Sequence, residues 1–289
     1  MPELPEVETT RRGLLPMVQG HRIAAVTVRD RRLRWPIPAN LAKQLSGKTV
    51  IDISRRGKYL LWDCRLDNAA PDPTDKHRGY LLSHLGMSGS LRAISADGAD
   101  GIETSPRKHD HLDIALDSGV IIRYTDPRRF GAMLWINGAA PKHTLLDALG
   151  PEPLSDDFSG AHLSAAAKGR SISVKEFIMN SQVVVGVGNI YASESLFRAG
   201  IHPKRAAGKV SAARFLRLSE AIRDTLQKAI HAGGSSLRDY VQANGELGYF
   251  QVNAFVYDRA NLPCRICNTT IRMFRQGQRS TYFCPGCQK

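Results

Sequence analysis

Residues 111–124, HLDIALDSGVIIRY, contain two short segments separated by a turn. In the first segment Leu112, Ile114 and Leu116 fall on every second residue, which is the period of a β-strand with one buried face. Ser118-Gly119 is a turn sequence, and the apolar segment VIIRY follows it directly. Two such segments around a short turn predict a β-hairpin. This part of the chain is therefore expected to be antiparallel β-structure.

Short β-rich segments of the same kind lie on both sides of this hairpin. Between residues 23 and 136 the sequence contains IAAVTV, TVIDIS, KYLLWD, YLLSHLGMSGSL and AMLWI. Many short antiparallel strands predict a sandwich or a barrel. Ahead of them, Pro5 suits the first position of a helix and acidic residues suit its N-terminal turn, so we expect a helix over 5–18. Two polar stretches, 67–78 and 95–107, are expected to be surface insertions.

The pattern changes after residue 148. The stretch LGPEPLSDDF, at 149–158, has the proline, glycine and acid content of a linker between domains. Helical segments are predicted at 159–168, 172–181, 189–200 and 211–231. In the last of these, Leu216, Ile222, Leu226 and Ile230 are expected on the apolar face. We therefore predict an α+β protein with three parts: a β-sandwich domain with an N-terminal helix (1–148), a helical domain (149–254) and a cysteine-containing β-hairpin (255–289).

The chain is strongly basic. Its 289 residues include 40 Lys and Arg against 27 Asp and Glu, for a formal net charge of +13. This excess favours binding to a polyanion, because Lys and Arg neutralise phosphate groups. A basic protein without such a partner is the alternative. The sequence has no run of eighteen apolar residues and no basic-then-apolar signal sequence, so we expect a cytoplasmic protein with no membrane partner.

Four of the five cysteines form two Cys-x2-Cys pairs, Cys264 with Cys267 and Cys284 with Cys287, separated by sixteen residues. This spacing predicts two hairpin knuckles that close a tetrahedral zinc site. Four protein ligands leave no position for a substrate, so the zinc ion is expected to be structural. The last 35 residues, 255–289, carry six basic residues against one acid, which suits contact with nucleic acid. Contact with another protein is the alternative for this segment.

The N-terminus has an unusual sequence, Met1-Pro2-Glu3. If Met1 is removed, as the small Pro2 permits, the chain begins with a secondary amine whose pKa is about 8. Such an amine is partly neutral near pH 7 and can attack an electrophilic carbon to form an iminium. Glu3 would then be within reach of the same carbon, able to give or take a proton. The alternative is that these residues are only a stiff lead-in to the helix.

A series of motifs in this chain resembles the formamidopyrimidine-DNA glycosylase family, which includes endonuclease VIII and acts in bacterial base-excision repair. The motifs are PELPEVETTRRGL (2–14), RRGKYLL (55–61), SHLGMSGSL (83–91), KHDH (108–111), YTDPRRFG (124–131), VVGVGNIYASESLF (184–197), GGSSLRDY (233–240), GYFQ (248–251) and the cysteine hairpin. They run in order from residue 2 to residue 289, sparing mainly the two insertions and the linker. The resemblance implies a helix-two-turn-helix in the helical domain and a lesion-recognition loop at 232–251.

The resemblance implies catalytic roles for five residues. Pro2 matches the nucleophile that attacks the sugar C1′, Glu3 matches the acid that protonates the opening sugar, and Glu6 matches a second acid that supports the site. Lys58 matches a lysine assigned to β-elimination. Arg279 matches the arginine at the tip of the zinc hairpin, assigned to phosphate contact and δ-elimination. Without the family, Lys58 would be interpreted as a solvated lysine at a hairpin turn, and the neighbouring Arg55 and Arg56 as a sign of a nearby phosphate.

The resemblance also implies DNA contacts. Met87, Arg128 and Phe130 match three residues that fill the space left when the damaged base is flipped out of the duplex. Further positions that match DNA contacts are His109, Arg170, Lys175 and Asn189. At Asn189 the side chain and the free amides of a helix start are expected to hold a phosphate. The neighbouring Gly186 and Gly188 are expected to allow close backbone approach.

The function implied is a monomeric, bifunctional glycosylase and AP lyase that acts on damaged double-stranded DNA in the bacterial cytoplasm, without a small-molecule cofactor. Leu4 and the Met87, Arg128 and Phe130 set favour the oxidised-purine branch, with 8-oxoguanine and formamidopyrimidines as substrates. One alternative is a pyrimidine-specific enzyme like endonuclease VIII. Another is a zinc-dependent DNA-binding protein that keeps the fold without the chemistry. A retained Met1 would favour that second alternative, because it blocks the amine of Pro2.

Overall fold

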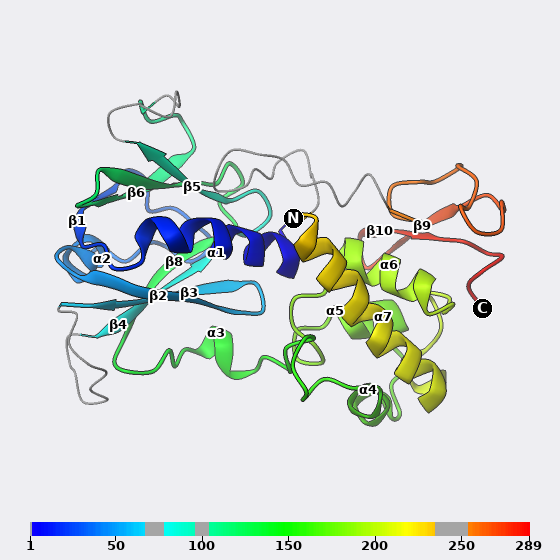
Figure 1. The fold of residues 1–289 in the computed structure, drawn as a ribbon. Coiled ribbons are helices and arrows are strands. Elements are labelled where there is room, and N and C mark those ends of the chain that lie inside the picture. The colour runs from blue at the N-terminus through cyan, green and yellow to red at the C-terminus, as the bar shows by residue number, and fades with distance from the viewer. Residues whose placement is uncertain (1, 67–77, 96–103, 235–253) are drawn as a thin grey trace. The chain divides into compact units, whose positions relative to one another are not determined.

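The computed structural model describes residues 2–66, 78–95, 104–234 and 254–289 (Figure 1). Its residues form two compact units. The first comprises Pro2 and residues 6–147, and the second comprises residues 3–5, 148–234 and 254–289, each apart from the gaps just given. Most of the two expected insertions (67–78 and 95–107) and most of the glycine-rich loop (232–251) lie outside the described residues.

The first unit contains two four-stranded antiparallel sheets, with strand orders β1-β6-β7-β5 and β2-β3-β4-β8. The bounds of the strands are Ile23–Val28 (β1), Thr49–Arg56 (β2), Tyr59–Arg65 (β3), Gly79–His84 (β4), Ser90–Ser95 (β5), Asp110–Leu116 (β6), Val120–Thr125 (β7) and Ala132–Asn137 (β8). The helices are α1 (Leu4–Val18), α2 (Leu41–Leu45) and α3 (Thr144–Asp147). The predicted sandwich is confirmed. The predicted hairpin is the β6–β7 pair, in which Ile114 lies opposite Ile122.

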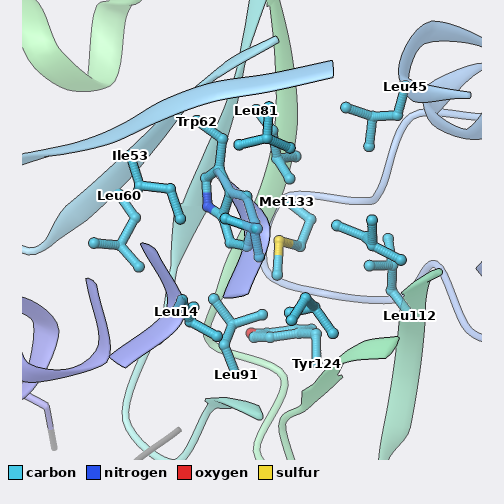
Figure 2. Close-up of a cluster of buried hydrophobic side chains, with 14 of the residues drawn as sticks. Leu14, Leu45, Ile53, Leu60, Trp62, Leu81, Leu91, Leu112, Tyr124 and Met133 are labelled. Carbon is cyan, nitrogen blue, oxygen red and sulfur yellow. The ribbon is translucent and has the colours of Figure 1, made fainter. Parts of the chain in front are cut away.

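The core of the first unit lies between the two sheets and is closed by α1. Figure 2 shows Trp62 and Met133, from the second sheet, facing Leu91 and Tyr124, from the first. Leu14 of α1 packs into the same cluster. The Trp62 side chain is 1% exposed, and its Nε1–H donates a hydrogen bond of 3.0 Å to Ser83 Oγ. The largest core side chain is therefore fixed both by packing and by a satisfied polar group.

Helix α1 is tied to strand β2 by a buried carboxylate. Glu8 accepts hydrogen bonds from the guanidinium groups of Arg11 (2.9 Å) and Arg12 (2.8 Å), and from Arg55 Nε on β2 (3.1 Å). Burial opposes ionisation of Glu8, but the arginine hydrogen bonds outweigh it and lower its pKa to about 2. One acid therefore holds the helix against the strand that leads to the Lys58 turn.

The second unit is helical and ends in a β-hairpin. Its helices are α4 (Gly160–Ala167), α5 (Val174–Met179), α6 (Asn189–Arg198), the 3-10 helix η1 (Ala207–Lys209) and α7 (Ala212–His231), and the hairpin pairs β9 (Arg272–Gln276) with β10 (Arg279–Phe283). Ser159 and Ser173 cap α4 and α5 by accepting from the N–H groups of His162 and Glu176. These bonds satisfy helix N–H groups that have no partner within the helix.

The apolar face of α7 differs by one position from the prediction. Ile222, Leu226 and Ile230 are buried as expected, whereas Leu216 is 55% exposed and Phe215 is buried in its place. Phe215 lies seven residues before Ile222, two turns of the helix, which keeps it on the face that packs against α4 and α6. The other predicted helices, α1, α4, α5 and α6, begin and end within a few residues of their predicted bounds, whereas the short α2, α3 and η1 were not predicted. None of the helices in the described residues is long and apolar enough to span a membrane.

Replacing Trp62 by alanine is expected to destabilise the protein by about 4 kcal/mol, because it removes a large buried side chain and leaves a cavity. The measurement is urea unfolding followed by circular dichroism. Trp35→Ala is the control, since Trp35 is only partly buried, and its loss should cost less than half as much. Equal losses for the two variants would contradict the assignment of Trp62 to the centre of the core.

The stabilising effect of Glu8 is expected to depend on pH. Because its pKa is lowered on folding from 4.5 to about 2, the stabilisation is complete above pH 4.5 and is lost as the pH falls through 2. Glu8→Gln should therefore cost about 1–2 kcal/mol at pH 7, allowing for solvent screening, and progressively less as the pH falls. Urea unfolding of both proteins at several pH values measures this difference, and a difference independent of pH would exclude the ion pairs as its source.

Candidate functional site

The carboxylate of Glu3 is bound at the N-terminus of α6. Its side chain is 1% exposed and accepts hydrogen bonds from the backbone N–H groups of Gly188 (2.7 Å) and Ile190 (3.0 Å), with Tyr191 N at 3.5 Å. A helix N-terminus favours an anion because its first N–H groups have no partner within the helix. The protein's own carboxylate therefore occupies the amides of Gly188 and Ile190, and a phosphate contact at Asn189 stays a prediction.

Two glycines make room for this contact. A Cβ atom on Gly188 would lie 2.3 Å from Cδ of Glu3, and one on Gly186 would lie 2.5 Å from Cβ of Leu4. Gly186 also has a φ of +82°, which side chains rarely adopt. In addition, Leu4 donates its N–H to the Gly186 carbonyl at 3.1 Å. The expected close backbone approach is confirmed, and the partner in the structure is the chain's own N-terminal segment.

Lys175 links three elements of the second unit. Its side chain is 1% exposed, and its Nζ donates to Asn189 Oδ1 (2.6 Å) and Thr281 Oγ1 (2.7 Å). Asn189 in turn donates its Nδ2–H to the Ser280 carbonyl at 3.0 Å. Burial, with a further contribution from Arg279, lowers the pKa of Lys175 to about 8. The ammonium group is thus held inside the protein, where it joins α5, the start of α6 and β10.

The four C-terminal cysteines converge on one point. The Sγ atoms of Cys264, Cys267, Cys284 and Cys287 all lie within 4.8 Å of one another. Four thiolates in this arrangement fit a tetrahedral zinc ion and complete its coordination, so the group would be structural. The hairpin β9–β10 runs between the two pairs, and Arg279 is exposed at the start of β10, next to its turn.

Lys58 lies on a two-residue turn between β2 and β3. Arg56 and Tyr59 are paired on either side of it, and Gly57 has a φ of +58°. Arg55 donates to the Gly57 carbonyl (3.1 Å) as well as to Glu8. The guanidinium that the sequence interpretation offered to a phosphate is therefore bound to Glu8, and it shapes the turn that carries Lys58.

Met87, Arg128 and Phe130 lie on two adjacent loops of the first unit. Met87 is on the turn between β4 and β5, and the other two residues are on the loop between β7 and β8. Phe130 is 41% exposed, and the Arg128 guanidinium lies 5.0 Å from the centre of its ring. The structure thus brings together an exposed aromatic ring, a cation and the half-buried Met87 on adjacent loops; these three side chains are called the wedge below.

His109 lines a basic pocket of about 230 Å³ at one end of the first sheet, together with Arg92, Arg107, Lys108 and Arg123. Its Nδ1 is buried without a hydrogen-bond partner among the described residues. Sequence reasoning did not identify Arg92 as part of this pocket. Its one sequence signal is that it directly follows the SHLGMSGSL motif.

His84 is a second residue that sequence reasoning missed, although it lies in a quoted motif. Its Nδ1 accepts the Gly86 N–H at 3.1 Å, and its ring centre is 4.8 Å from that of Tyr59. Burial, then the charges of Lys58 and Arg34, lower the pKa of His84 to about 4. The neutral ring therefore holds the turn before Met87 close to the turn that carries Lys58.

The remaining predicted residues occupy different surroundings. Pro2 is buried, and Glu6 is fully buried on α1 in the first unit. Arg170 is exposed in the segment after α4. Among the predicted catalytic residues, Pro2, Glu6 and Lys58 belong to the first unit, and Glu3 and Arg279 to the second.

Comparison with domain families gives three matches in chain order. Residues 1–133 match the formamidopyrimidine-DNA glycosylase N-terminal domain and residues 149–241 match the H2TH domain of the same enzyme. Residues 261–289 match the zinc finger found in this enzyme and in isoleucyl-tRNA synthetase. The cysteine cluster therefore holds one structural zinc ion.

Curated relatives match over the full length of the chain. Formamidopyrimidine-DNA glycosylase of Methylococcus capsulatus is 53% identical over 289 residues, and that of Burkholderia lata is 54% identical over 292 residues, with 100% of both chains covered in each case.

Solved structures agree with the sequence matches. The MutM (Fpg) protein of Thermus thermophilus has a TM-score of 0.84 at 34% identity and covers 99% of this chain and 98% of its own. The Lactococcus lactis enzyme, in complex with DNA containing an abasic site, has a TM-score of 0.84 at 31% identity with 99% of both chains covered. On this evidence, the chain belongs to the formamidopyrimidine-DNA glycosylase family.

Proposed function

We propose that this base-excision repair DNA glycosylase removes oxidised purines, 8-oxoguanine and formamidopyrimidines, with Pro2 as its nucleophile, and then cleaves the strand as an AP lyase. The observation that carries the proposal is the buried carboxylate of Glu3, the residue next to Pro2. The N–H groups of Gly188 and Ile190 hold this carboxylate in place. A segment that is only a stiff lead-in to a helix would need neither this bond nor the glycine that makes room for it. The fixed geometry supports a role for these first residues in chemistry.

The proposed reaction can be written so that each proton and bond is accounted for. The Pro2 nitrogen forms a bond to C1′, the bond from C1′ to the damaged base breaks, and the base leaves with the proton that the Pro2 nitrogen gives up. Opening of the sugar ring places the electron pair on O4′, where Glu3 supplies a proton, and leaves an iminium at C1′. In the β-elimination Lys58 takes the C2′ proton and the 3′ phosphate leaves. In the δ-elimination the C4′ proton passes to water and the 5′ phosphate, contacted by Arg279, leaves.

The proposed DNA contacts follow from the exposed cations and the wedge. Arg128, Arg170 and Arg279 are exposed and can meet phosphates or base edges. The complex of the Lactococcus lactis enzyme with DNA containing Fapy-dG, at a TM-score of 0.83, supports a ring-opened purine as one substrate. Met87 and Phe130 would replace the stacking of the everted base, with Arg128 reading the base opposite.

We further propose that the protein acts as a monomer on chromosomal DNA in the bacterial cytoplasm, since every residue assigned a role comes from one chain. We also propose that the chain is divided into parts 1–148, 149–254 and 255–289. This division is supported by domain matches at 1–133, 149–241 and 261–289.

Pro2→Gly is expected to reduce excision of 8-oxoguanine from a duplex with cytosine opposite by at least about 100-fold, because the secondary amine is lost. Glu3→Gln should reduce it similarly, because the amide cannot supply the proton and turns an N–H donor toward the amides of α6. Single-turnover strand cleavage measures both effects. Glu220→Gln, at an exposed position on α7, is the control and should retain wild-type activity.

The same assay separates the alternatives. Wild-type protein whose intact mass shows that Met1 is gone should cleave the 8-oxoguanine duplex faster than a thymine glycol duplex. The reverse order would indicate a pyrimidine-specific enzyme. Cleavage of neither duplex, together with tight DNA binding, would indicate a DNA-binding protein without chemistry.

Arg279→Ala is expected to flatten the salt dependence of DNA binding by roughly one unit in the plot of log K against log salt, because one phosphate contact is lost. Fluorescence anisotropy with a labelled duplex over a range of salt concentrations measures the slope. Lys228→Ala is the control, since Lys228 Nζ is paired with Asp224 at 2.8 Å. An unchanged slope for Arg279→Ala would remove this residue from the phosphate contacts.

A further inference from the structure

Asp126 is a buried carboxylate that the reaction does not use. It is 0% exposed, and it accepts hydrogen bonds from Ser88 Oγ–H (2.9 Å), the Gly131 N–H (2.9 Å), the Tyr124 hydroxyl (3.1 Å) and the Arg128 N–H (3.3 Å). A buried charge with this many donors is stabilised and rigid, whereas loss of a donor is costly. The position of the Asp126 side chain within the first unit is therefore fixed by its hydrogen bonds.

Three of the four donors come from the two loops that carry Met87, Arg128 and Phe130, and the fourth, Tyr124, lies on β7. Ser88 follows Met87 on the turn between β4 and β5, while Arg128 and Gly131 flank Phe130 on the loop between β7 and β8. Ser88 Oγ also accepts the Arg128 N–H at 3.2 Å. The serine hydroxyl thus bridges from one loop to the carboxylate and the backbone of the other.

The two loops also meet backbone to backbone. Gly86 has a φ of +63°, and a Cβ atom there would lie 2.5 Å from the Gly131 nitrogen and from the Phe130 carbonyl carbon. Two loops that pack this closely cannot move far independently. The Ser88–Asp126 hydrogen bond is then a side-chain contact that fixes the position of one loop relative to the other.

The backbone conformation of Arg129, which lies between Arg128 and Phe130, is fixed by contacts with residues outside the two loops. Arg129 has a φ of +60°, unusual for a residue with a side chain. Its carbonyl accepts the Arg34 N–H at 2.7 Å, and its guanidinium is paired with Asp30 at 2.8 Å. A backbone state of this kind persists only when its surroundings fix it. These contacts keep the loop in a single shape.

We propose that Ser88 and Asp126 are positioning residues for base eversion, which lock Met87, Arg128 and Phe130 into one rigid wedge. The proposal rests on the proposed function, since it concerns how that wedge works. Eversion costs a few kcal/mol of unstacking, and the wedge offsets this only if its three side chains enter together. Loops that had to be ordered on binding would add an entropic cost. The lock also sets the position of Arg128 against the base opposite the lesion, and therefore the preference for that base.

The test compares Ser88→Ala with wild type on two substrates. On a duplex carrying 8-oxoguanine opposite cytosine, single-turnover excision should fall about tenfold, the effect of one hydrogen bond to a charged group. On a single-stranded oligonucleotide with an abasic site, strand cleavage should change less than about twofold, because nothing has to be everted or filled. The control is Ser219→Ala, another buried serine, whose hydroxyl bonds the Leu216 carbonyl at 2.8 Å on α7.

A double-mutant cycle separates positioning from loss of fold. In a Met87→Ala background, Ser88→Ala should have a much smaller effect than in wild type, because it acts through the wedge. The ratio of excision opposite cytosine to excision opposite adenine should also move toward one. Asp126→Asn should behave like Ser88→Ala if its melting temperature shows that it folds.

Three results would overturn the proposal. Equal losses on both substrates, fully additive effects with Met87→Ala, or an unchanged ratio between opposite bases would each reduce Ser88 to a structural residue. Failure of the proposed function gives a different result, because wild type itself would then not excise 8-oxoguanine from the duplex.

Discussion

The hydrogen bonds from the first N–H groups of α6 to Glu3 are the contact on which the proposed site depends. The start of a helix attracts a negative charge, and here the charge comes from the third residue of the chain. Gly188 is required because any side chain there would overlap the carboxylate. Since Pro2 is joined to Glu3 by a single peptide bond, the same contact fixes one end of the segment that carries the proposed nucleophile. An N-terminus is ordinarily frayed, and this one is anchored.

The same principle recurs elsewhere in the described parts of the molecule, where buried acids accept hydrogen bonds from several donors at once. Asp126 holds two loops together, and Glu194 accepts three successive backbone N–H groups of residues 255–257, each at 2.9 Å. Glu8 neutralises arginines on α1 and β2. Several of the acids are used internally, whereas Arg128, Arg170 and Arg279 are exposed, and such a distribution of charge suits binding to a polyanion. A net charge of +13 therefore serves DNA binding.

Local patterns predicted most of the fold, and long-range bonds accounted for what was missed. Alternation identified the strands, and two Cys-x2-Cys pairs identified the zinc site, because each strand and each pair can be recognised within a few residues. The Met1-Pro2-Glu3 sequence itself suggested the Pro2 amine as a nucleophile, whereas the resemblance supplied Lys58, which no periodicity marks. The occupation of the α6 amides by Glu3 joins residues 185 positions apart, and the Ser88–Asp126 bond spans 38 positions. Neither leaves a repeat or a composition that sequence reasoning could read.

The most direct test of the account is the location of the covalent bond in a borohydride-reduced complex. The protein would be trapped on a duplex carrying 8-oxoguanine, digested, and the modified peptide identified by mass spectrometry. The account predicts that the sugar remnant is attached to the N-terminal peptide, at the nitrogen of Pro2, with Met1 absent. Attachment at Lys58 or another lysine would show that the anchored N-terminus supports the reaction without carrying it out.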